Sequence, residues 1–253
     1  MKKFIGIVQF LTRMPINMDI GFIEDFHEST RYFPLVGLIL GIIYYVIGYI
    51  GEMCFNNNFI VATLILVGTA MLTGGLHLDG LGDTFDGLYS YRDKERILEI
   101  MKDSRVGTNA LLSVVFVLLL KLGFLMELLN QNKLWVVIIM PVIARTMQVL
   151  SCYHGKTPRA HGMGNIFIGK VSNTSLGIAL STTIVITLGV LWLFESFSLN
   201  VVIETTVLIG IVIVILKLFE RSVYRKIDGI TGDVLGCICE LTELGVCIAM
   251  YFL

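Results

Sequence analysis

Charged residues are scarce in this chain. Asp, Glu, Lys and Arg make up 15% of its 253 residues, whereas hydrophobic residues make up 55%. Together with a mean hydropathy of +0.82, this composition excludes an ordinary soluble globular domain. The formal net charge of −1 leaves no excess of cations for binding nucleic acid. The composition therefore predicts an integral membrane protein.

Cysteine is also sparse, and its spacing carries no signature. The five cysteines lie in or beside apolar segments without a C-x-x-C pair. That pattern predicts neither a disulfide framework nor a zinc site. The chain also has no low-complexity linker and no polar second region. We therefore expect residues 1–253 to form a single polytopic membrane domain.

Seven apolar stretches have roughly the length needed to cross a bilayer as helices. They cover residues 35–50, 59–76, 110–129, 134–150, 176–194, 201–218 and 234–253. The short apolar part of Met1–Met14 is followed by Arg13 and Pro15 without a small-residue cleavage site, which favours an interfacial helix over a cleaved signal. The predicted fold is an all-α integral membrane bundle of about seven transmembrane helices, with short interfacial helices on its cytoplasmic side.

Lys and Arg are distributed unequally among the connecting segments. They gather in the N-terminal segment, in residues 92–105, in residues 156–170 and at residues 217–226. The alternate connections 51–58, 130–133 and 195–200 contain a single cation, Lys133. Because cationic loops stay in the cytoplasm, we expect a multi-pass protein of the cytoplasmic membrane with its N-terminus inside and its C-terminus outside. All nine Asp residues then fall on the cytoplasmic side.

The densest polar motif is Thr73–Gly87, which holds three aspartates and five glycines in fifteen residues. Asp79, Asp83 and Asp86 are spaced i, i+4 and i+7, so on a helix they would project from one face. Hard carboxylate oxygens suit Mg²⁺, which commonly bridges protein carboxylates to substrate phosphates. The motif predicts a magnesium platform, and its structural alternative is a solvated acidic helix start.

Residues 91–105 alternate charged and apolar side chains with helical spacing, as shown by Ile97, Ile100 and Met101. We expect an amphipathic helix lying on the cytoplasmic interface. It would hold Lys102, Asp103 and Arg105 beside the aspartates. The alternative is a plain surface helix stabilised by pairs of opposite charge.

Two further cytoplasmic loops combine glycine with charge. Residues 154–165 hold three glycines, two histidines and two cations, a composition that could wrap an anion; we assign no metal role to the histidines. Residues 228–233 place Asp233 just before the last apolar stretch, where it serves either the site or as a helix cap. We therefore expect the active site in segments 73–107 and 220–233.

Ionisable residues also fall inside the apolar stretches, where they are costly and usually mark a site or a pair. Arg145 and Glu240 lie at similar depths, about 10 Å from their cytoplasmic ends, and we expect them to pair. Lys121 and Glu243 lie deeper. Lys121 could extend outward along its helix toward the interface.

With these segments assembled, the chain resembles the cobalamin synthase family, the adenosylcobinamide-GDP ribazoletransferases, over essentially its full length. The resemblance rests on the aspartate-rich block and the Lys-Asp-Ser-Arg block together with three shorter motifs. The segments are Thr12–Pro15, Tyr32–Gly37, Thr73–Gly87, Ile100–Gly107 and Thr231–Asp233.

The resemblance implies the last assembly step of the cobalamin nucleotide loop. Such enzymes join adenosylcobinamide-GDP to α-ribazole or its 5′-phosphate, release GMP and require magnesium. The expected metal ligands are Asp79, Asp83 and Asp86, and the expected catalytic residues are Asp83, Asp86, Lys102, Asp103 and Arg105. The expected substrate contacts are Gly74, Gly75, His77, Gly80, Arg145, Thr231 and Asp233. The partners are these substrates and the lipid bilayer, and the sequence leaves open a homo-oligomer.

Each expected role has a chemical reason. Carboxylate-bound magnesium would offset charge on the pyrophosphate. Lys102 and Arg105 would contact phosphate oxygens, and Asp86 would accept the proton of the attacking ribazole 5′-hydroxyl. The glycines would allow close backbone approach to a bulky ligand, unless they serve helix packing instead.

Two other functions compete with this assignment. A CDP-alcohol-type phospholipid phosphotransferase also uses an aspartate-rich helix with metal ions, although its longer Asp-Gly-Ala-Arg motif is absent here; the accepted nucleotide donor separates the two. A cation-coupled secondary transporter is the second alternative. Transporters usually place coupling sites near the midplane and show internal repeats, whereas this cluster lies at the cytoplasmic boundary.

Overall fold

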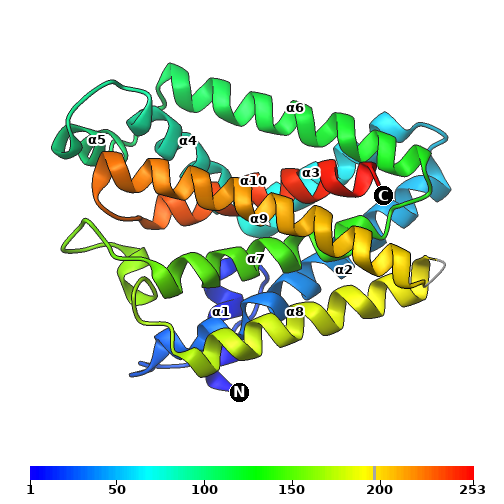
Figure 1. Cartoon of the computed structure of the whole chain (residues 1–253), viewed down its shortest axis with the longest axis horizontal. Helices are drawn as coiled ribbons and strands as arrows, with labels where there is room; N and C mark the ends of the chain where they lie inside the picture. Colours follow the sequence, from blue (N-terminus) through cyan, green and yellow to red (C-terminus); the bar gives the residue numbers. More distant parts are fainter. Residues whose placement is uncertain (196–197) are drawn as a thin grey trace.

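The structure is a computed structural model that describes residues 1–195 and 198–253. All regular structure within those residues is helical, as expected (Figure 1). The α-helices are α1 (Lys2–Leu11), α2 (Phe33–Cys54), α3 (Asn58–Thr73), α4 (Leu76–Leu88), α5 (Lys94–Ile100), α6 (Thr108–Asn130), α7 (Val136–His154), α8 (Asn173–Phe194), α9 (Leu199–Ile227) and α10 (Gly232–Tyr251). Two 3₁₀ turns, η1 (Phe26–Tyr32) and η2 (Met163–Ile166), lie in the connections.

Within the described residues, six helices are long and apolar enough to cross a membrane, namely α2, α6, α7, α8, α9 and α10. Counting α3 and α4 together as one bent span gives seven. The predicted number therefore holds only when that pair is one span. This set of helices defines a multi-pass helical membrane protein.

The predicted second span, 59–76, stops earlier than expected. Helix α3 ends at Thr73, because Gly74 and Gly75 adopt left-handed φ values of 63° and 70°. The chain then turns by 89° into α4. Helix α3 has 16 residues and is about 24 Å long, which is shorter than the ~30 Å hydrocarbon core.

Helices α7 and α10 form the centre of the bundle, and most of their residues are buried. Helix α7 packs against α2 and α10, and α4 packs against α10 and α6 (Figure 1). Glycines permit the closest approach: a Cβ at Gly37 of α2 would lie 2.6 Å from the carbonyl oxygen of Pro141 in α7. The tightly packed centre leaves α8 and α9 on the outside.

The connections separate into two ends of the bundle. One end, on the left in Figure 1, carries the segments around α5, the connection from α7 to α8 and the turn from α9 to α10. The opposite end carries the connections α2–α3 and α6–α7 and the C-terminus. This alternation agrees with the predicted order of the loops. The predicted connection 195–200 includes residues 196–197, which lie outside the described residues.

Two further helix boundaries differ from the expectation. The amphipathic helix expected over residues 91–105 is α5, which covers only Lys94–Ile100, and Lys102, Asp103 and Arg105 belong to the turn that follows it. Helix α9 is longer than expected and continues through its cationic end to Ile227. The N-terminal segment forms the expected helix, α1.

Candidate active site

The aspartate-rich motif forms helix α4 despite its glycines. Gly80 faces the backbone of α10, and a Cβ there would lie 2.7 Å from the carbonyl oxygen of Asp233. Gly80 therefore serves helix packing, where the sequence suggested a substrate contact. Because α4 is helical throughout Leu76–Leu88, the spacing of Asp79, Asp83 and Asp86 places them on one side of the helix.

A cavity of about 790 Å³ opens beside this side of α4. Asp79 and Asp83 line it together with Gly74, Gly75 and Arg13. Its opposite wall is the turn between α5 and α6, residues 101–106, and the start of α6. The structure thus brings the two predicted blocks, the aspartates and the Lys-Asp-Ser-Arg segment, around one space.

Arg13 is a cavity residue that we did not predict as part of the site. Its backbone N–H donates a hydrogen bond of 2.7 Å to the carbonyl oxygen of Leu72. Its side chain lies against Gly74, where a Cβ would approach the Arg13 Nε to 2.5 Å. The sequence signal was present, because Arg13 belongs to the Thr12–Pro15 motif, but the pairing with α3 is a long-range contact.

Asp103 and Arg105 form an ion pair within the turn after α5. The Arg105 guanidinium donates to both Asp103 carboxylate oxygens, with a shortest distance of 2.5 Å. Hydrogen bonds from Arg105 hold the pKa of Asp103 at about 2. The Arg105 side chain is 86% exposed, so its guanidinium is fixed by Asp103 while remaining open to an incoming anion.

Asp86 lies at the edge of the cavity rather than in its wall. Its carboxylate lies against Gly107, where any Cβ would collide with the Asp86 oxygens. Gly107 directly follows the cavity-lining Val106. The glycine therefore allows the turn after α5 to approach Asp86 closely.

His77 and Arg145 do not reach this cavity. Both side chains are buried between α4, which carries His77, and α7, which carries Arg145, and there the Arg145 Nη1 contacts the His77 Nε2. The same Nη1 donates to Gln148 at 3.1 Å and to Cys239 at 3.0 Å. Because arginine can only donate, the His77 Nε2 accepts and the ring proton resides on Nδ1. The two residues hold α4 against α7 and α10, in place of the expected substrate contact.

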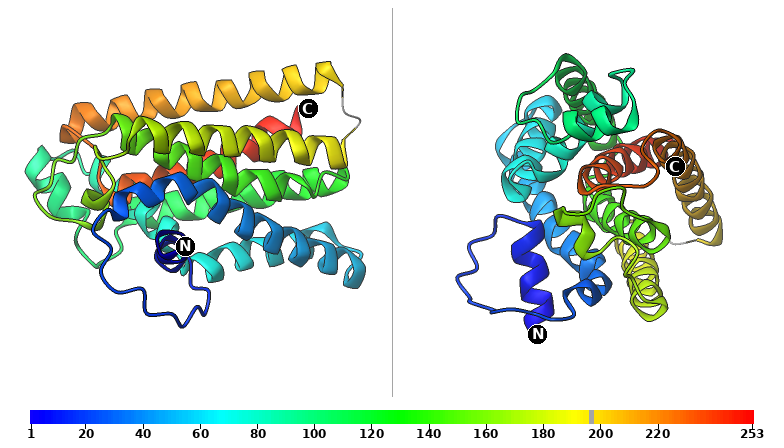
Figure 2. Two further views of the ribbon diagram at one scale, coloured as in Figure 1. Left: turned by 90° about the horizontal axis from the view of Figure 1, so that it is seen from below. Right: turned by 90° about the vertical axis from the view of Figure 1, so that its left-hand side faces the viewer.

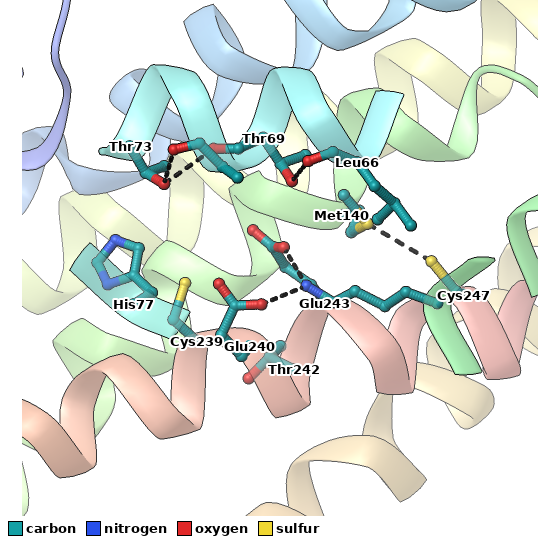
Figure 3. Close-up of polar contacts among 12 residues, drawn as sticks. Leu66, Thr69, Thr73, His77, Met140, Cys239, Glu240, Thr242, Glu243 and Cys247 are labelled. Carbon is teal, nitrogen blue, oxygen red and sulfur yellow. Dashed lines mark hydrogen bonds and ion pairs between the residues drawn. The ribbon is translucent and has the colours of Figure 1, made fainter. Parts of the chain in front are cut away.

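The expected pair of Arg145 with Glu240 does not form. Glu240 binds Lys121 instead, at 2.7 Å, and Glu243 binds the same ammonium at 2.6 Å. Figure 3 shows both carboxylates of α10 joined to one nitrogen, that of Lys121. Lys121 is 2% exposed, so the expectation that it extends outward is wrong. A buried ammonium that pairs with two carboxylates has a lower free energy than an unpaired ammonium facing lipid.

Thr231 and Asp233 are held by structural contacts. The Thr231 hydroxyl caps α10 by accepting from the N–H of Val234 at 3.3 Å, so the cap is Thr231 rather than Asp233. Asp233 accepts from Thr231 at 3.1 Å and from the Arg159 guanidinium at 2.8 Å. Arg159 also donates to the Leu98 carbonyl at 3.2 Å and thereby ties the 154–165 loop to α5 and α10.

The carboxylates at the cavity are not neutralised by the protein. Among the described residues, Asp79, Asp83 and Asp86 have no ion-pair partner. Like charges in a half-buried space repel, and a cation between them would remove that cost. The cavity wall also offers Lys102 and Arg105 to an anion.

Magnesium fits these donors as an ion that arrives with a phosphorylated ligand. In the described part of the chain, no three His, Cys, Asp or Glu side chains are gathered closely enough to hold a metal by themselves. Magnesium usually takes one or two protein carboxylates, water and substrate phosphates rather than a complete protein cage. Asp79 and Asp83, both in the wall of the cavity, match that requirement.

The fold and the site define a polytopic helical membrane protein with a carboxylate-lined cavity at one end of its bundle. The family model described as cobalamin-5-phosphate synthase matches residues 3–251. The chain belongs to this cobalamin-5-phosphate synthase family.

Three relatives are similar over nearly their whole length, and each is called adenosylcobinamide-GDP ribazoletransferase. The protein of Clostridioides difficile is 49% identical over 253 residues, which cover 100% of this chain and 98% of the relative. That of Alkaliphilus metalliredigens is 46% identical over 96% of this chain and 92% of its own length. That of Clostridium novyi is 36% identical over 96% and 94%. No solved structure matches the chain.

Proposed function

We propose that this chain is a membrane transferase that joins adenosylcobinamide-GDP to α-ribazole or α-ribazole 5′-phosphate. The products are adenosylcobalamin or its 5′-phosphate, and GMP. Membership of the family and the names of full-length relatives support this reaction. The observation that carries the assignment to a site is the 790 Å³ cavity, where unpaired Asp79 and Asp83 face the cationic turn after α5.

The reaction exchanges one phosphorus–oxygen bond for another. A ribose hydroxyl of the acceptor forms a bond to the phosphorus on the corrinoid side, and the bond between that phosphorus and the GMP oxygen breaks. An acceptor phosphorylated at its 5′ position has no free 5′-hydroxyl, so a ring hydroxyl must attack if both acceptors use the same group. The hydroxyl proton passes to a carboxylate, and GMP leaves with the electron pair.

The residues around the cavity divide this work by their charge. Asp79 and Asp83 would hold magnesium, which when bound would offset the negative charge of the pyrophosphate. Lys102 and Arg105 would bind phosphate oxygens and place the donor. Asp86, at the edge of the cavity beside Gly107, would accept the proton.

A reconstituted assay tests the reaction. Purified protein in lipid vesicles receives adenosylcobinamide-GDP, α-ribazole and Mg²⁺, and corrinoid product and GMP are measured together. Equal amounts of both products are expected, and neither should form after chelation of the metal. Release of GMP without corrinoid product would contradict a transferase. Acceptance of a CDP-alcohol in place of adenosylcobinamide-GDP would favour the phospholipid enzyme.

We also place the protein in the cytoplasmic membrane with the cavity facing the cytoplasm. The cationic segments lie at the cavity end of the bundle, and such segments remain in the cytoplasm. In a background lacking the five native cysteines, Tyr91→Cys should resist an impermeant thiol reagent in intact cells. Asn56→Cys, at the opposite end, should react and serves as the control. Exchange of the two results would reverse the orientation.

A further inference from the structure

Helices α8 and α9 are consecutive and antiparallel, yet they leave a gap between them. Helix α8 packs against α7, whereas α9 packs against α10. The end-on view in Figure 2 shows α8 and α9 apart, with α7 on their inner side. A cavity of about 310 Å³ lies among these three helices and shares no lining residue with the aspartate-lined cavity. We call it the α8–α9 slot.

The slot is long and narrow. Its lining runs from Leu180 to Leu191 on α8 and from Val202 to Ile213 on α9, which is about 16 Å along each helix. A helix of that length, as a cylinder ~10 Å across, would occupy about 1,200 Å³, more than the 940 Å³ of empty space in the slot. The slot is therefore too small for a helix of a second copy. The long axis of the slot runs along α8 and α9, and because both helices are membrane spans, it lies roughly along the bilayer normal.

The walls of the slot are apolar, except for threonine hydroxyls. Ile184 lines the slot and is 58% exposed at the perimeter of the bundle, so the slot opens toward the hydrocarbon of the membrane. A space with such walls is a poor place for water, which needs two or more polar partners. Hydrocarbon is the matching occupant.

Two of the threonines have hydroxyls without a partner in the described part of the chain, which indicates that the occupant carries an oxygen that can accept a hydrogen bond. Thr187 and Thr205 are 8% and 2% exposed, and their hydroxyls have no partner within the described residues. The neighbouring slot threonines are satisfied: Thr183 and Thr206 donate to the carbonyls four residues earlier, at 2.9 Å and 2.7 Å. A buried hydroxyl without a partner is costly, and an oxygen acceptor in the slot would remove that cost.

We propose that the α8–α9 slot binds one acyl chain of a bilayer phospholipid, whose ester carbonyl accepts hydrogen bonds from Thr187 and Thr205. Both threonines lie toward the α8–α9 connection, within the last two turns of α8 and the first two turns of α9. The lipid therefore enters from the leaflet opposite the aspartate-rich end, and its chain runs toward the middle of the bilayer. The site is separate from the proposed transferase cavity and does not depend on that function.

Photo-crosslinking of the unmodified sequence tests the proposal directly. The protein is placed in vesicles containing phosphatidylethanolamine with a diazirine in the middle of one acyl chain, and crosslinked peptides are identified by mass spectrometry. We expect crosslinks to concentrate on the slot-facing residues of α8 and α9. Crosslinks spread evenly over the slot face and the outward face around Val185, which is 70% exposed, would overturn the proposal.

Variants that fill the slot provide the second measurement. Thr205→Phe should remove the phospholipid that remains with the protein in mild detergent, from about one per chain to none, by native mass spectrometry. Val185→Phe adds the same ring on the outward face of α8 and should retain the lipid. Thr187→Val and Thr205→Val together keep the shape, and we expect several-fold weaker retention. Equal retention in Thr205→Phe and Val185→Phe, or detergent alone in the slot, would contradict the proposal.

Discussion

The two groups of charges in this molecule are treated in opposite ways. In the middle of the bundle, Lys121 lies between Glu240 and Glu243 at 2.7 Å and 2.6 Å, and all three are buried. At the end of the bundle, Asp79 and Asp83 line a cavity, and neither has an ion-pair partner among the described residues. The first group contains a cation of its own, and the second has none among the described residues.

This difference separates a structural group from a binding group. In the apolar interior, an uncompensated charge is costly, and Lys121, Glu240 and Glu243 reduce that cost by binding one another. At the membrane boundary, water tolerates unpaired carboxylates until a ligand and its cation arrive. Charge density alone therefore does not distinguish these two groups, whereas the presence or absence of an ion-pair partner does.

The largest effect is expected from breaking the buried ion pairs of Lys121 with Glu240 and Glu243. Lys121→Met leaves Glu240 and Glu243 buried without their cation, and we expect a loss of about 3–5 kcal/mol in the free energy of unfolding. Thermal unfolding in detergent measures this loss. The triple variant Lys121→Met, Glu240→Gln and Glu243→Gln removes every charge and should recover most of the stability. If Lys121→Met unfolds like the unsubstituted protein, the buried group contributes no stability.

The next effect should appear in activity without a loss of stability. Asp83→Asn keeps the shape of the side chain but removes a charge at the cavity, and we expect turnover to fall by about 10²–10³-fold if Asp83 holds the metal. Asp79→Asn should behave similarly. The control is Asp228→Asn, at the same end of the bundle but with its side chain 67% exposed and paired with Lys94. Turnover within a few-fold of normal in both cavity variants would reject the metal site.

A smaller effect on activity is expected from replacing the guanidinium of Arg105. Arg105→Lys keeps the charge but loses the planar fork that can bind two phosphate oxygens, so we expect kcat to fall about 10-fold. Charge builds on the GMP phosphate as it leaves, so the loss should fall mainly on kcat rather than on the KM of the donor. Steady-state kinetics with each substrate varied in turn provides the measurement. A change confined to the KM of ribazole would place Arg105 at the acceptor.

The smallest effect is expected from the solvent-facing pair of Lys94 and Asp228. Their side chains are 33% and 67% exposed, and such pairs contribute about 0–1 kcal/mol. Lys94→Ala should therefore change the unfolding temperature in detergent by no more than a few degrees and leave turnover unchanged. A loss as large as that of Lys121→Met would remove the distinction between buried and exposed charge on which the comparison rests.

Local patterns predicted much of this molecule. Apolar length located the spanning helices, and the spacing of three aspartates placed them on one side of α4. The bend before α4 was missed, because the sequence does not reveal that Gly74 and Gly75 both adopt left-handed conformations. The amphipathic pattern of 91–105 also continued past the true end of α5 at Ile100.

Long-range contacts account for the remaining differences. Similar depth suggested a pair between Arg145 and Glu240, but rotation of the helices sets the partners, and Lys121 takes Glu240. Arg13 reaches the cavity from the N-terminal segment, and Arg159 reaches Asp233 from the loop after α7. The periodicity of apolar and charged residues along the sequence contains no information about contacts between segments that are far apart in the chain. How Asp79, Asp83 and Asp86 act in the reaction stays a prediction.

The packing of α4 on α10 also orders events during synthesis of the protein. Gly80 of α4 lies directly against Gly236 of α10, and α10 is made well after α4, because helices α5 to α9 lie between them in the chain. The segment with the aspartates is therefore made before α10, one of the two long helices against which it packs, whereas the other, α6, follows it sooner. Helix α3 is too short to cross the bilayer by itself, and together with α4 it counts as one bent span. A nascent chain consequently lacks the packed form of α4, and with it the arrangement of the aspartates seen in the structure, until α10 has entered the membrane.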